Sequence, residues 1–418
     1  MKIQNTKSKI ALAVLLLAAC TTTSRPPVDP AELQRAQQLA ARPEIAAAFD
    51  HVERNREHIL QEWITLTRIH APSGRETERA TYVEQQLRAM NLDSVRRDAA
   101  GNVIGIRKGT GGAQPVVIDA HLDTVFQQEL TIEPRVEDGR IYAPGVGDNT
   151  RNVEAILAAA RAIEAAGITT KGDLVYLFTV EEETSFKGVD QFLADNKGRI
   201  GHFIALDGGY SGFTYGGLGI NWFEFHFIGP GGHTRSRTPP YSASLPMARA
   251  IDRIYKLRVP DDSNLNIGML GGADVVNAKA ADAWFSIDIR SVRNEVMADL
   301  ERRAVAIAEA EARRAGMKFQ LKEISRRAAS MIPGHREGPL VTRAEAVYEA
   351  LGFASPSITP TATNHVNAAL AAGVSGISTG TTPCRDSHAL TESCEIEPFY
   401  RGIKKIILLG VAMAEVDG

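Results

Sequence analysis

The sequence VVIDAHLDTV (residues 116–125) begins with an apolar, largely β-branched run and continues with Asp119, His121 and Asp123 at alternate positions. Its first three residues predict a buried strand of a parallel sheet. In open α/β sheets the active site lies at the carboxyl ends of the strands, which is where His121 and Asp123 fall. The His-x-Asp spacing suits a neutral imidazole that binds a metal while the carboxylate holds the other ring N–H. Taken alone, however, the tripeptide is more typical of a strand-end histidine bonded to backbone or solvent.

Around this stretch, short apolar runs alternate with longer segments of helical periodicity. Such alternation predicts an α/β fold, with a mainly parallel sheet and helices on both faces. The expected strands are 103–107, 116–120, 173–180 and 202–207, and the expected helices are 46–70, a second one ending at residue 87, 152–166, 339–352 and 399–416.

The pattern changes near Tyr215, where strands and helices follow the order β-α-β-β-α-β. That order is the ferredoxin-like split motif, so we expect an inserted α+β domain. The expected elements are 217–229, 242–257, 264–272, 283–290, 294–316 and 318–325. A chain of 418 residues is longer than one core usually holds. The predicted organisation is a signal peptide (1–19), a tether (20–45), a catalytic domain in two parts (46–214 and 327–418) and an inserted dimerisation or lid domain (215–326).

The N-terminus has the composition of a bacterial lipoprotein signal. Three lysines precede the apolar segment ALAVLLLAA (11–19), which is too short to span a bilayer as a mature helix. The segment ends in Leu-Ala-Ala-Cys20, which resembles a lipobox and implies cleavage before Cys20 and a lipid on that cysteine. We therefore expect a lipoprotein anchored at the periplasmic face of a bacterial membrane. Thr21 favours the outer membrane by analogy with enteric lipoproteins. An ordinary secretory signal with a chance cysteine is the alternative.

The net charge argues against nucleic acid as a partner, and the two cysteines after Cys20 could be oxidised or reduced. A net charge of −3 provides no basic face, so a nucleic acid is not an expected partner. After Cys20, the chain contains only Cys384 and Cys394. In oxidising surroundings they would form a disulfide, while free thiols and extra zinc ligands are the alternatives.

Histidines and carboxylates follow the predicted strands in five clusters: His121 with Asp123, Asp148 in a glycine-rich turn, the glutamates 181–183, Asp207, and His388. Each alone has a structural explanation, such as a helix cap for Asp148 or a surface charge run for the glutamates. Together at one sheet edge, imidazole and carboxylate ligands without a thiolate predict a hydrolytic zinc site. Two ions bridged by one carboxylate would activate a water, and a spare glutamate would serve as general base.

With these motifs, residues 50–415 resemble the dinuclear-zinc metallopeptidase family that includes aminoacylase, glutamate carboxypeptidase, tripeptidase T and acetylornithine deacetylase. The resemblance implies a zinc exopeptidase-like fold and two zinc ions per chain, with Co²⁺ or Mn²⁺ as substitutes. It implies that Asp148 bridges both ions. His121 and Asp207 would complete one metal site, and Glu183 and His388 the other. Asp123 would orient His121, and Glu182 would be the general base.

The roles of the three glutamates depend on how residues 181–183 align with the glutamate pair of the family. In the family the ligand is the second glutamate of a pair and lies five residues before a glycine. Gly188 therefore assigns the ligand to Glu183 and the base to Glu182. A slip of one residue would make Glu181 the base.

The insert carries a second part of the resemblance. His233, in GPGGHTRSR (229–237), resembles the family histidine that enters the partner subunit's active site and steadies the oxyanion, which implies a homodimer through the insert. The segments around Asn277 and Arg290 resemble those that hold the substrate carbonyl and carboxylate, and the guanidinium fork of an arginine suits a carboxylate. For the dimer contact we expect a free edge on the strand GINWFEFHF (219–227).

Three departures from the family pattern weaken any transfer of substrate specificity. No proline follows Asn277, Ser185 replaces a frequent glycine, and ATNHVNAA (362–369) replaces a Gly-x-Asp-x-Asn segment, with His365 where the Asp would fall. None of these changes removes an expected ligand.

The sequence thus predicts a zinc hydrolase that cleaves a terminal peptide bond of small peptides. An N-acyl amino acid deacylase is the alternative within enzymes. A non-catalytic periplasmic solute-binding lipoprotein on a peptidase scaffold is the alternative outside them, and loss of the base or of a ligand would favour it.

Overall fold

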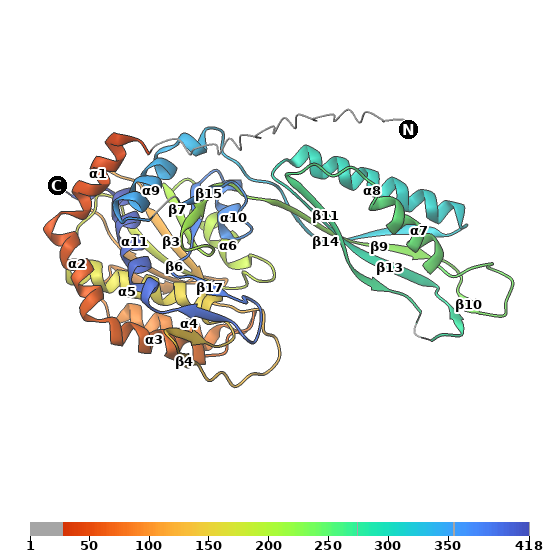
Figure 1. Ribbon diagram of the computed structural model, residues 1–418, viewed down its shortest axis with the longest axis horizontal. Helices are drawn as coiled ribbons and strands as arrows, with labels where there is room; N and C mark the ends of the chain where they lie inside the picture. The colour runs from red at the N-terminus through yellow and green to blue at the C-terminus, as the bar shows by residue number, and fades with distance from the viewer. Residues whose placement is uncertain (1–27, 274, 354–355, 418) are drawn as a thin grey trace, which may run out of the picture.

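A computed structural model describes residues 28–273, 275–353 and 356–417. The chain forms a large body and an elongated arm that projects from it (Figure 1). The predicted signal peptide and the lipidation site Cys20 lie outside the described residues. Among the helices described, none combines the length and the apolar character needed to cross a bilayer.

An eight-stranded sheet forms the centre of the large body (Figure 1). Strand β3 pairs in parallel with both β6 and β7, and β7 pairs in parallel with β16, whereas β1 and β2 are antiparallel. The mainly parallel sheet is therefore confirmed. In spatial order the strands are β1 (Ser94–Arg97), β2 (Val103–Arg107), β6 (Leu174–Thr179), β3 (Val116–His121), β7 (His202–Leu206), β16 (Ser375–Thr379), β8 (Gly212–Thr214) and β15 (Ser357–Thr359).

Helices cover both faces of this sheet, because alternate residues of its strands enter two different cores. Ile118 packs with helices such as α5 and α11, whereas Val117 packs with α6 and α10. His121 lies an even number of residues from Val117, on the α6 and α10 face. The helices are α1 (Pro30–Ala40), α2 (Pro43–Arg54), α3 (Arg56–Arg68), α4 (Thr77–Arg88), α5 (Arg151–Ala165), α6 (Lys187–Asp195), α9 (Pro339–Ala350), α10 (His365–Ala371) and α11 (Glu397–Ala414), with short turns η1 (Val146–Thr150) and η2 (His335–Glu337).

A small four-stranded sheet brings distant loops together beside the large one. Its order is β17 (Cys384–Arg385), β18 (Ser393–Glu395), β5 (Arg140–Tyr142) and β4 (Arg135–Glu137). Strand β18 therefore lies directly against the segment that leads into the Asp148 loop.

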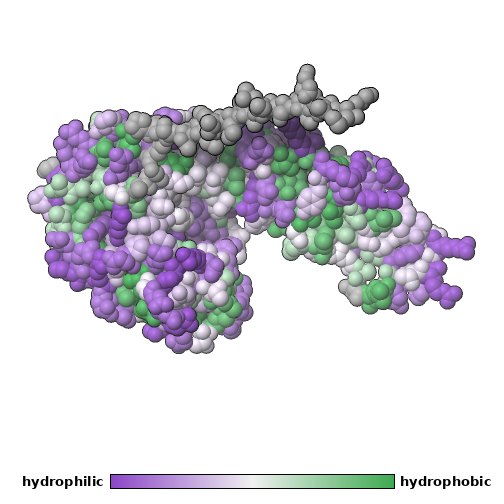
Figure 2. All heavy atoms as spheres, in the orientation of Figure 1, coloured by the Kyte–Doolittle hydropathy of each residue, from purple (hydrophilic) through white to green (hydrophobic). Residues whose placement is uncertain are grey.

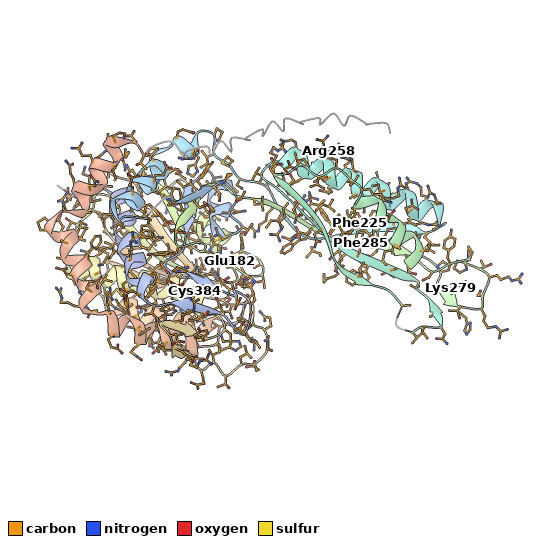
Figure 3. All side chains as sticks on the ribbon, viewed as in Figure 1. Glu182, Phe225, Arg258, Lys279, Phe285 and Cys384 are labelled. Atoms are coloured by element: carbon orange, nitrogen blue, oxygen red, sulfur yellow. A yellow bond between two sulfur atoms is a disulfide. The ribbon has the colours of Figure 1, made fainter. Side chains whose placement is uncertain are left out.

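The arm is an antiparallel sheet with two helices on one face (Figure 1). Its elements are β9 (Gly219–Ile228), α7 (Ser244–Ile254), β11 (Ser263–Gly271), β13 (Asp282–Ser291), α8 (Asn294–Arg314) and β14 (Lys318–Arg327). The spatial order β11-β13-β9-β14 is that of the ferredoxin-like motif. Inward-facing residues such as Phe225 and Phe285 form a separate core under the helices (Figure 3). A further pair, β10 (Gly232–His233) and β12 (Ala278–Lys279), lies at the far end of the arm (Figure 1).

Two expectations about these elements are wrong. Strand β9 has no free edge, because it is hydrogen-bonded to β13 on one side and β14 on the other, so the outer strands are β11 and β14. The helix expected over 46–70 is two helices, α2 and α3. They break at Asn55, whose side chain bonds the carbonyl of His51 and ends the first helix.

Candidate active site

Loops at the carboxyl ends of the sheet strands bring the predicted ligands together. His121 is the last residue of β3, Glu182 and Glu183 follow β6, and Asp207 follows β7 directly. Asp148 arrives from the turn before α5, and His388 comes from the loop between β17 and β18. Figure 3 shows Glu182 in the part of the body that faces the arm.

Asp148 lies between two histidines. Its Oδ1 is 3.1 Å from His121 Nε2, and its Oδ2 is 3.1 Å from His388 Nε2. His388 Nε2 is also 3.4 Å from Glu183 Oε1. Ligand atoms of His121, Asp148 and Asp207 lie within 4.8 Å of one another, and so do those of Asp148, Glu183 and His388. The two triads share Asp148.

The donor atoms of this cluster fit a divalent cation. His121 Nε2 and Glu183 Oε1 are buried and neither makes a hydrogen bond of good geometry. Buried polar atoms are rarely left this way without a compensating partner. Imidazole nitrogens and carboxylate oxygens are ligands that zinc and related ions accept.

Asp123 supports the cluster through three elements at once. Its carboxylate lies 3.3 Å from His121 Nδ1, as the His-x-Asp spacing predicted. It also accepts the backbone N–H groups of Glu182 and Glu183, both at 3.0 Å, and the Ser73 hydroxyl at 2.6 Å. Burial would raise the pKa of Asp123, but these bonds, led by the one from His121, lower it to about 2. Asp123 therefore fixes the glutamate loop as well as the imidazole.

The glutamates of the triplet have different surroundings. Glu182 is 8% exposed, and burial is the main reason that its pKa is raised well above the usual value. Glu181 is turned outward, where its carboxylate pairs with Lys187 at 2.7 Å and accepts the Ser185 hydroxyl. Of the three, Glu182 is the buried carboxylate and Glu183 is the one that faces His388, and the assignment of the base to Glu182 and the ligand to Glu183 stays a prediction.

Charge around the cluster is strongly negative. Burial and the neighbouring Asp148 carboxylate raise the pKa of Asp207 to about 6. A hydrogen bond to Asp148 and the nearby Glu183 carboxylate raise the pKa of His388 to about 10. A site with such a surplus of carboxylates attracts cations.

The cluster opens into a cleft between the body and the arm, and Figure 2 shows the notch between these two parts. This cleft has a volume of about 380 Å³ and includes Glu182, Glu183 and His388. The arm contributes Trp222 and Arg290. Arg290 Nε also bonds Asp288 at 2.9 Å, which orients its guanidinium.

Two predicted substrate residues lie elsewhere. His233 and Asn277 are both exposed at the far end of the arm, where the Thr234 N–H bonds the Asn277 carbonyl. Lys279, on the strand paired with that of His233, marks this end in Figure 3. Within one chain, neither residue lines the cleft.

Cys384 and Cys394 form a disulfide, with Cα atoms 4.1 Å apart on the paired strands β17 and β18. The loop that it closes contains His388. It also contains Glu392, a fully buried carboxylate that the sequence analysis did not single out.

Several other supporting residues could not be recognised from the sequence alone. Arg79 and Arg151 are buried cations that donate to loop carbonyls, and neither has a spacing that marks it. Glu76 accepts the backbone N–H of Glu181. Ser73 and Glu76 have the Ser-x-x-Glu spacing of a helix capping box, which could have drawn attention to both.

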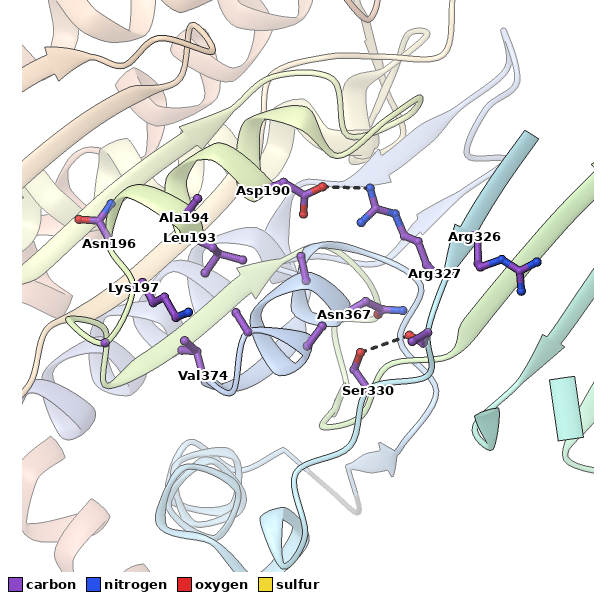
Figure 4. Close-up of a pocket in the computed structure, with 15 residues that line it drawn as sticks. Asp190, Leu193, Ala194, Asn196, Lys197, Arg326, Arg327, Ser330, Asn367 and Val374 are labelled. Carbon is purple, nitrogen blue, oxygen red and sulfur yellow. Dashed lines mark hydrogen bonds and ion pairs between the residues drawn. The ribbon is translucent and has the colours of Figure 1, made fainter. Parts of the chain in front are cut away.

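A second hollow, of about 630 Å³, lies where the arm joins the body (Figure 4). Arg327 reaches from β14 to Asp190 at 3.3 Å and to the Ser185 carbonyl at 2.5 Å. None of the proposed metal ligands lines this hollow. It is a joint between the two parts of the chain rather than part of the cluster.

Comparisons with known proteins agree with this geometry. Carboxypeptidase G2 from Pseudomonas sp. (strain RS-16) is 24% identical over 241 residues, which cover 53% of this chain and 57% of that protein. Cysteinylglycine-S-conjugate dipeptidase from Corynebacterium striatum is 29% identical over 157 residues, or 34% of each chain. The aligned part thus spans little more than half of the first relative and a third of the second.

Solved structures share the whole architecture. A tripeptidase from Staphylococcus aureus superimposes with a TM-score of 0.77 at 20% identity, covering 86% of this chain and 99% of that one. A dinuclear metal-binding peptidase from Bacillus subtilis gives a TM-score of 0.68 at 14% identity, covering 87% and 100%. At these identities the likeness shows the fold.

The family assignment rests on a longer match. Residues 117–409 match the family described as peptidase family M20/M25/M40, and this range contains both metal triads, Glu182 and the entire arm. The chain therefore belongs to peptidase family M20/M25/M40 and is a hydrolase of that family.

Proposed function

We propose that this protein is a dinuclear zinc exopeptidase that hydrolyses a terminal peptide bond of small peptides. The observation that carries the proposal is the pair of ligand triads that share Asp148, with the buried Glu182 beside them. That pairing supports two ions per chain with Asp148 as the bridge. His121 and Asp207 would complete one site, and Glu183 and His388 the other. Zinc fits the ligand types best, and Co²⁺ or Mn²⁺ could replace it.

When bound, such a pair of cations polarises a carbonyl and makes water more acidic. Glu182 is suited to take the proton of the attacking water, because burial raises its pKa and so makes it a stronger base than an exposed glutamate. The same carboxyl then returns the proton to the leaving amine. Asp123 keeps Glu182 in place through the backbone N–H that it accepts.

Substrate recognition is assigned to the arm. Arg290 lines the cleft, and its guanidinium can form two parallel bonds to a substrate carboxylate. A peptide whose terminal carboxylate binds Arg290 would place a bond near that end at the metal cluster, which supports the cleavage of a terminal peptide bond.

The remaining substrate residues are proposed to act across a homodimer. His233 and Asn277 lie together at the far end of the arm, so a second chain could bring both into this cleft. The outer strand β11 and the loop after it expose Met269, Leu270 and Val276, which supports pairing along that edge. Figure 2 shows hydrophobic residues gathered at this end of the arm.

An N-acyl amino acid deacylase is the second candidate. Its support is that the relatives include succinyl-diaminopimelate desuccinylase from Corynebacterium glutamicum, 36% identical over 83 residues, or 20% of this chain and 22% of that protein. A solute-binding protein without activity is disfavoured, because the base and all five proposed ligands lie in the described cluster.

Hydrolysis assays on matched substrates decide between the two enzyme classes. A panel of dipeptides and tripeptides is compared with N-acetyl and N-succinyl amino acids, with the metal content measured by mass spectrometry. Faster turnover of the peptides is expected. Turnover confined to the N-acyl compounds would support the deacylase instead.

We also propose that the chain is a lipoprotein attached through Cys20 and exposed to the periplasm. The disulfide supports an oxidising compartment. In bacterial cells the unaltered chain is expected to incorporate a labelled fatty acid, and the Cys20→Ser variant is expected to lose this label. Labelling that persists in this variant would exclude Cys20 as the attachment site.

A further inference from the structure

Glu392 is a buried carboxylate outside the proposed ligand set, yet it is bonded to the loop that carries Asp148. It is 0% exposed. Its Oε2 accepts the Gly145 N–H at 2.7 Å, and its Oε1 accepts the N–H groups of Gly147 at 3.2 Å and Asp148 at 2.9 Å. One side chain therefore gathers three backbone donors from four consecutive residues.

The Asp148 loop has few other means of holding this shape. Gly145 has a φ of +71°, a conformation that side chains rarely adopt. Two side chains bond carbonyls of this loop: the Trp63 indole donates to the Val146 carbonyl at 2.9 Å, and the Thr150 hydroxyl donates to the Gly145 carbonyl at 2.6 Å. Both of these bonds use carbonyls. Its N–H groups at 145, 147 and 148 depend on Glu392.

Glu392 is itself held by the disulfide loop. Its own backbone carbonyl accepts the Ala143 N–H at 3.1 Å, and Cys394 stands two residues further on. A Cβ added to Gly147 would lie 2.6 Å from Cys394 Sγ and 2.8 Å from Cys384 Sγ, so the disulfide packs directly on the Asp148 loop. Two covalently joined strands thus present the carboxylate to the loop.

A buried arginine balances the charge at this position. Arg151 donates to the Thr382 carbonyl, to Cys384 Sγ at 2.8 Å and to the Gly208 carbonyl at 2.8 Å. It therefore links the start of the disulfide loop to the residue after Asp207. Burial and the Asp148 carboxylate raise the pKa of Glu392 to about 7, while the N–H groups of Asp148 and Gly145 and the charge of Arg151 favour its charged form.

We propose that Glu392 is a positioning residue for the metal centre: it fixes the backbone at 145–148 so that the two oxygens of Asp148 face His121 and His388. This inference rests on the proposed function, in which Asp148 bridges two ions. Bonds from N–H groups to a charged carboxylate are stronger than those to a neutral acceptor. Without them, three buried donors would lack a partner and the loop would rearrange.

The proposal predicts weaker metal binding when the acceptor is altered. In Glu392→Gln an amide NH₂ would face at least one of the three N–H donors, so one bond becomes a repulsion. In Glu392→Asp the charge is kept, but the shorter side chain cannot reach all three donors. Residues that orient metal ligands typically change metal affinity by roughly 10- to 100-fold when replaced, and we expect a loss in that range for both variants.

The test uses the full chain, stripped of metal by chelation and titrated with Zn²⁺ against a chromophoric chelator. Glu395→Gln is the matched control, since Glu395 lies on β18, three residues after Glu392, but pairs outward with Arg140 at 3.0 Å. Visible absorption of the Co²⁺-saturated protein is the second readout, because it reports ligand geometry and does not respond to folding stability alone. Both Glu392 variants should shift this spectrum, and the control should match the unaltered protein.

The outcomes separate this inference from the function on which it rests. If the unaltered chain binds no metal, or Asp148→Asn binds it equally well, the proposed function fails. A different result would overturn the positioning role. In it, the unaltered chain binds metal and Asp148→Asn does not, yet both Glu392 variants keep the metal affinity to within about twofold and keep the Co²⁺ spectrum. Glu392→Asp keeps the test open should the glutamine variant not fold.

Discussion

At the scale of single residues, the site is built from side chains whose partners, rather than their types, set their roles. Glu181, Glu182 and Glu183 are chemically identical neighbours. One is tied to Lys187 at the surface, one is buried, and one faces His388. The order of the triplet in the chain could be predicted from the spacing to Gly188, but these environments depend on Asp123 and on the fold around it.

Glu182→Gln should retain metal and lose turnover. The amide keeps the shape of the side chain but cannot accept the proton of water, and general-base catalysis is typically worth 10²- to 10⁴-fold, so a loss of about that size is expected. Initial rates on the best peptide substrate, with metal content measured in parallel, provide the check. Glu181→Gln is the matched control and should stay near the unaltered rate. If Glu181→Gln were instead the inactive variant that keeps its metal, the assignment would shift by one residue.

At the scale of elements, helix α5 contains a carboxyl group that links stability to pH. Glu154 is fully buried there, and burial, with the neighbouring Glu62 carboxylate, raises its pKa well above the usual 4.5. The folded state therefore favours the protonated form. Its contribution to stability is complete below the pKa of the unfolded chain and is lost as the pH rises through the pKa of the folded state.

Glu154→Gln should consequently be more stable than the unaltered protein at neutral and alkaline pH, with the advantage shrinking toward pH 4. The free energy of unfolding from urea titrations at several pH values gives the comparison. Glu164→Gln, on the same helix, is the control because Glu164 is only half-buried and accepts the Asn91 N–H. A Glu154→Gln difference that did not vary with pH would exclude the linkage.

The β17–β18 hairpin is the second element with a testable role. Its disulfide joins residues ten positions apart, and a loop of that size contributes about 2–3 kcal/mol by restricting the unfolded chain. Cys384→Ser with Cys394→Ser should lower the free energy of unfolding by that amount and weaken zinc binding. Chemical denaturation and chelator competition measure the two effects. Unchanged zinc affinity in the double variant would show that the hairpin does not support the metal site.

Much of the element pattern follows from the sequence, and the exceptions have physical reasons. Alternating strands and helices, and the split motif of the arm, could be predicted because apolar periodicity reports which face of each element is buried. The break at Asn55 was missed because apolar spacing continues across it. The edge of β9 was misassigned because pairing partners depend on sheet order, which no single strand encodes.

The site shows the same division. His121 and Asp207 could be found because a histidine or carboxylate at a strand end is a local signal. Asp148 and His388 lie in loops, and the resemblance to the family, rather than a strand end, marked them. Glu392 and Arg151 could not be found, since Glu392 binds the backbone at Asp148 and Arg151 binds the Thr382 carbonyl, each more than 200 residues away in the chain. Residues that bind metal leave a trace in the sequence, whereas residues that hold the binding loop do not.

At the scale of the whole molecule, the arm separates two groups of proposed substrate residues. Arg290 lines the cleft of its own chain, while His233 and Asn277 lie exposed at the far end of the arm. In the proposed homodimer, the complete site is formed by two chains.

Mixing inactive variants tests that property. Glu182→Gln and His233→Ala chains are each expected to have little activity, yet a hybrid dimer would contain one cleft with an intact base and an intact partner histidine. Activity is expected to recover to about a quarter of normal at most, because random pairing makes half of the dimers hybrids and each hybrid has one intact cleft. Absence of recovery, under conditions in which subunit exchange is demonstrated by labelled chains, would place His233 outside the partner's site.

The central claim is that two metal sites share Asp148, and metal stoichiometry tests it most directly. Equilibrium dialysis against Zn²⁺ should give two ions per unaltered chain, and Asp148→Asn should lose affinity at both sites because both triads use this carboxylate. Asp195→Asn, an exposed change on α6, should still bind both ions. An Asp148→Asn chain that retains two ions with unaltered affinity, or an unaltered chain that binds only one, would contradict the account.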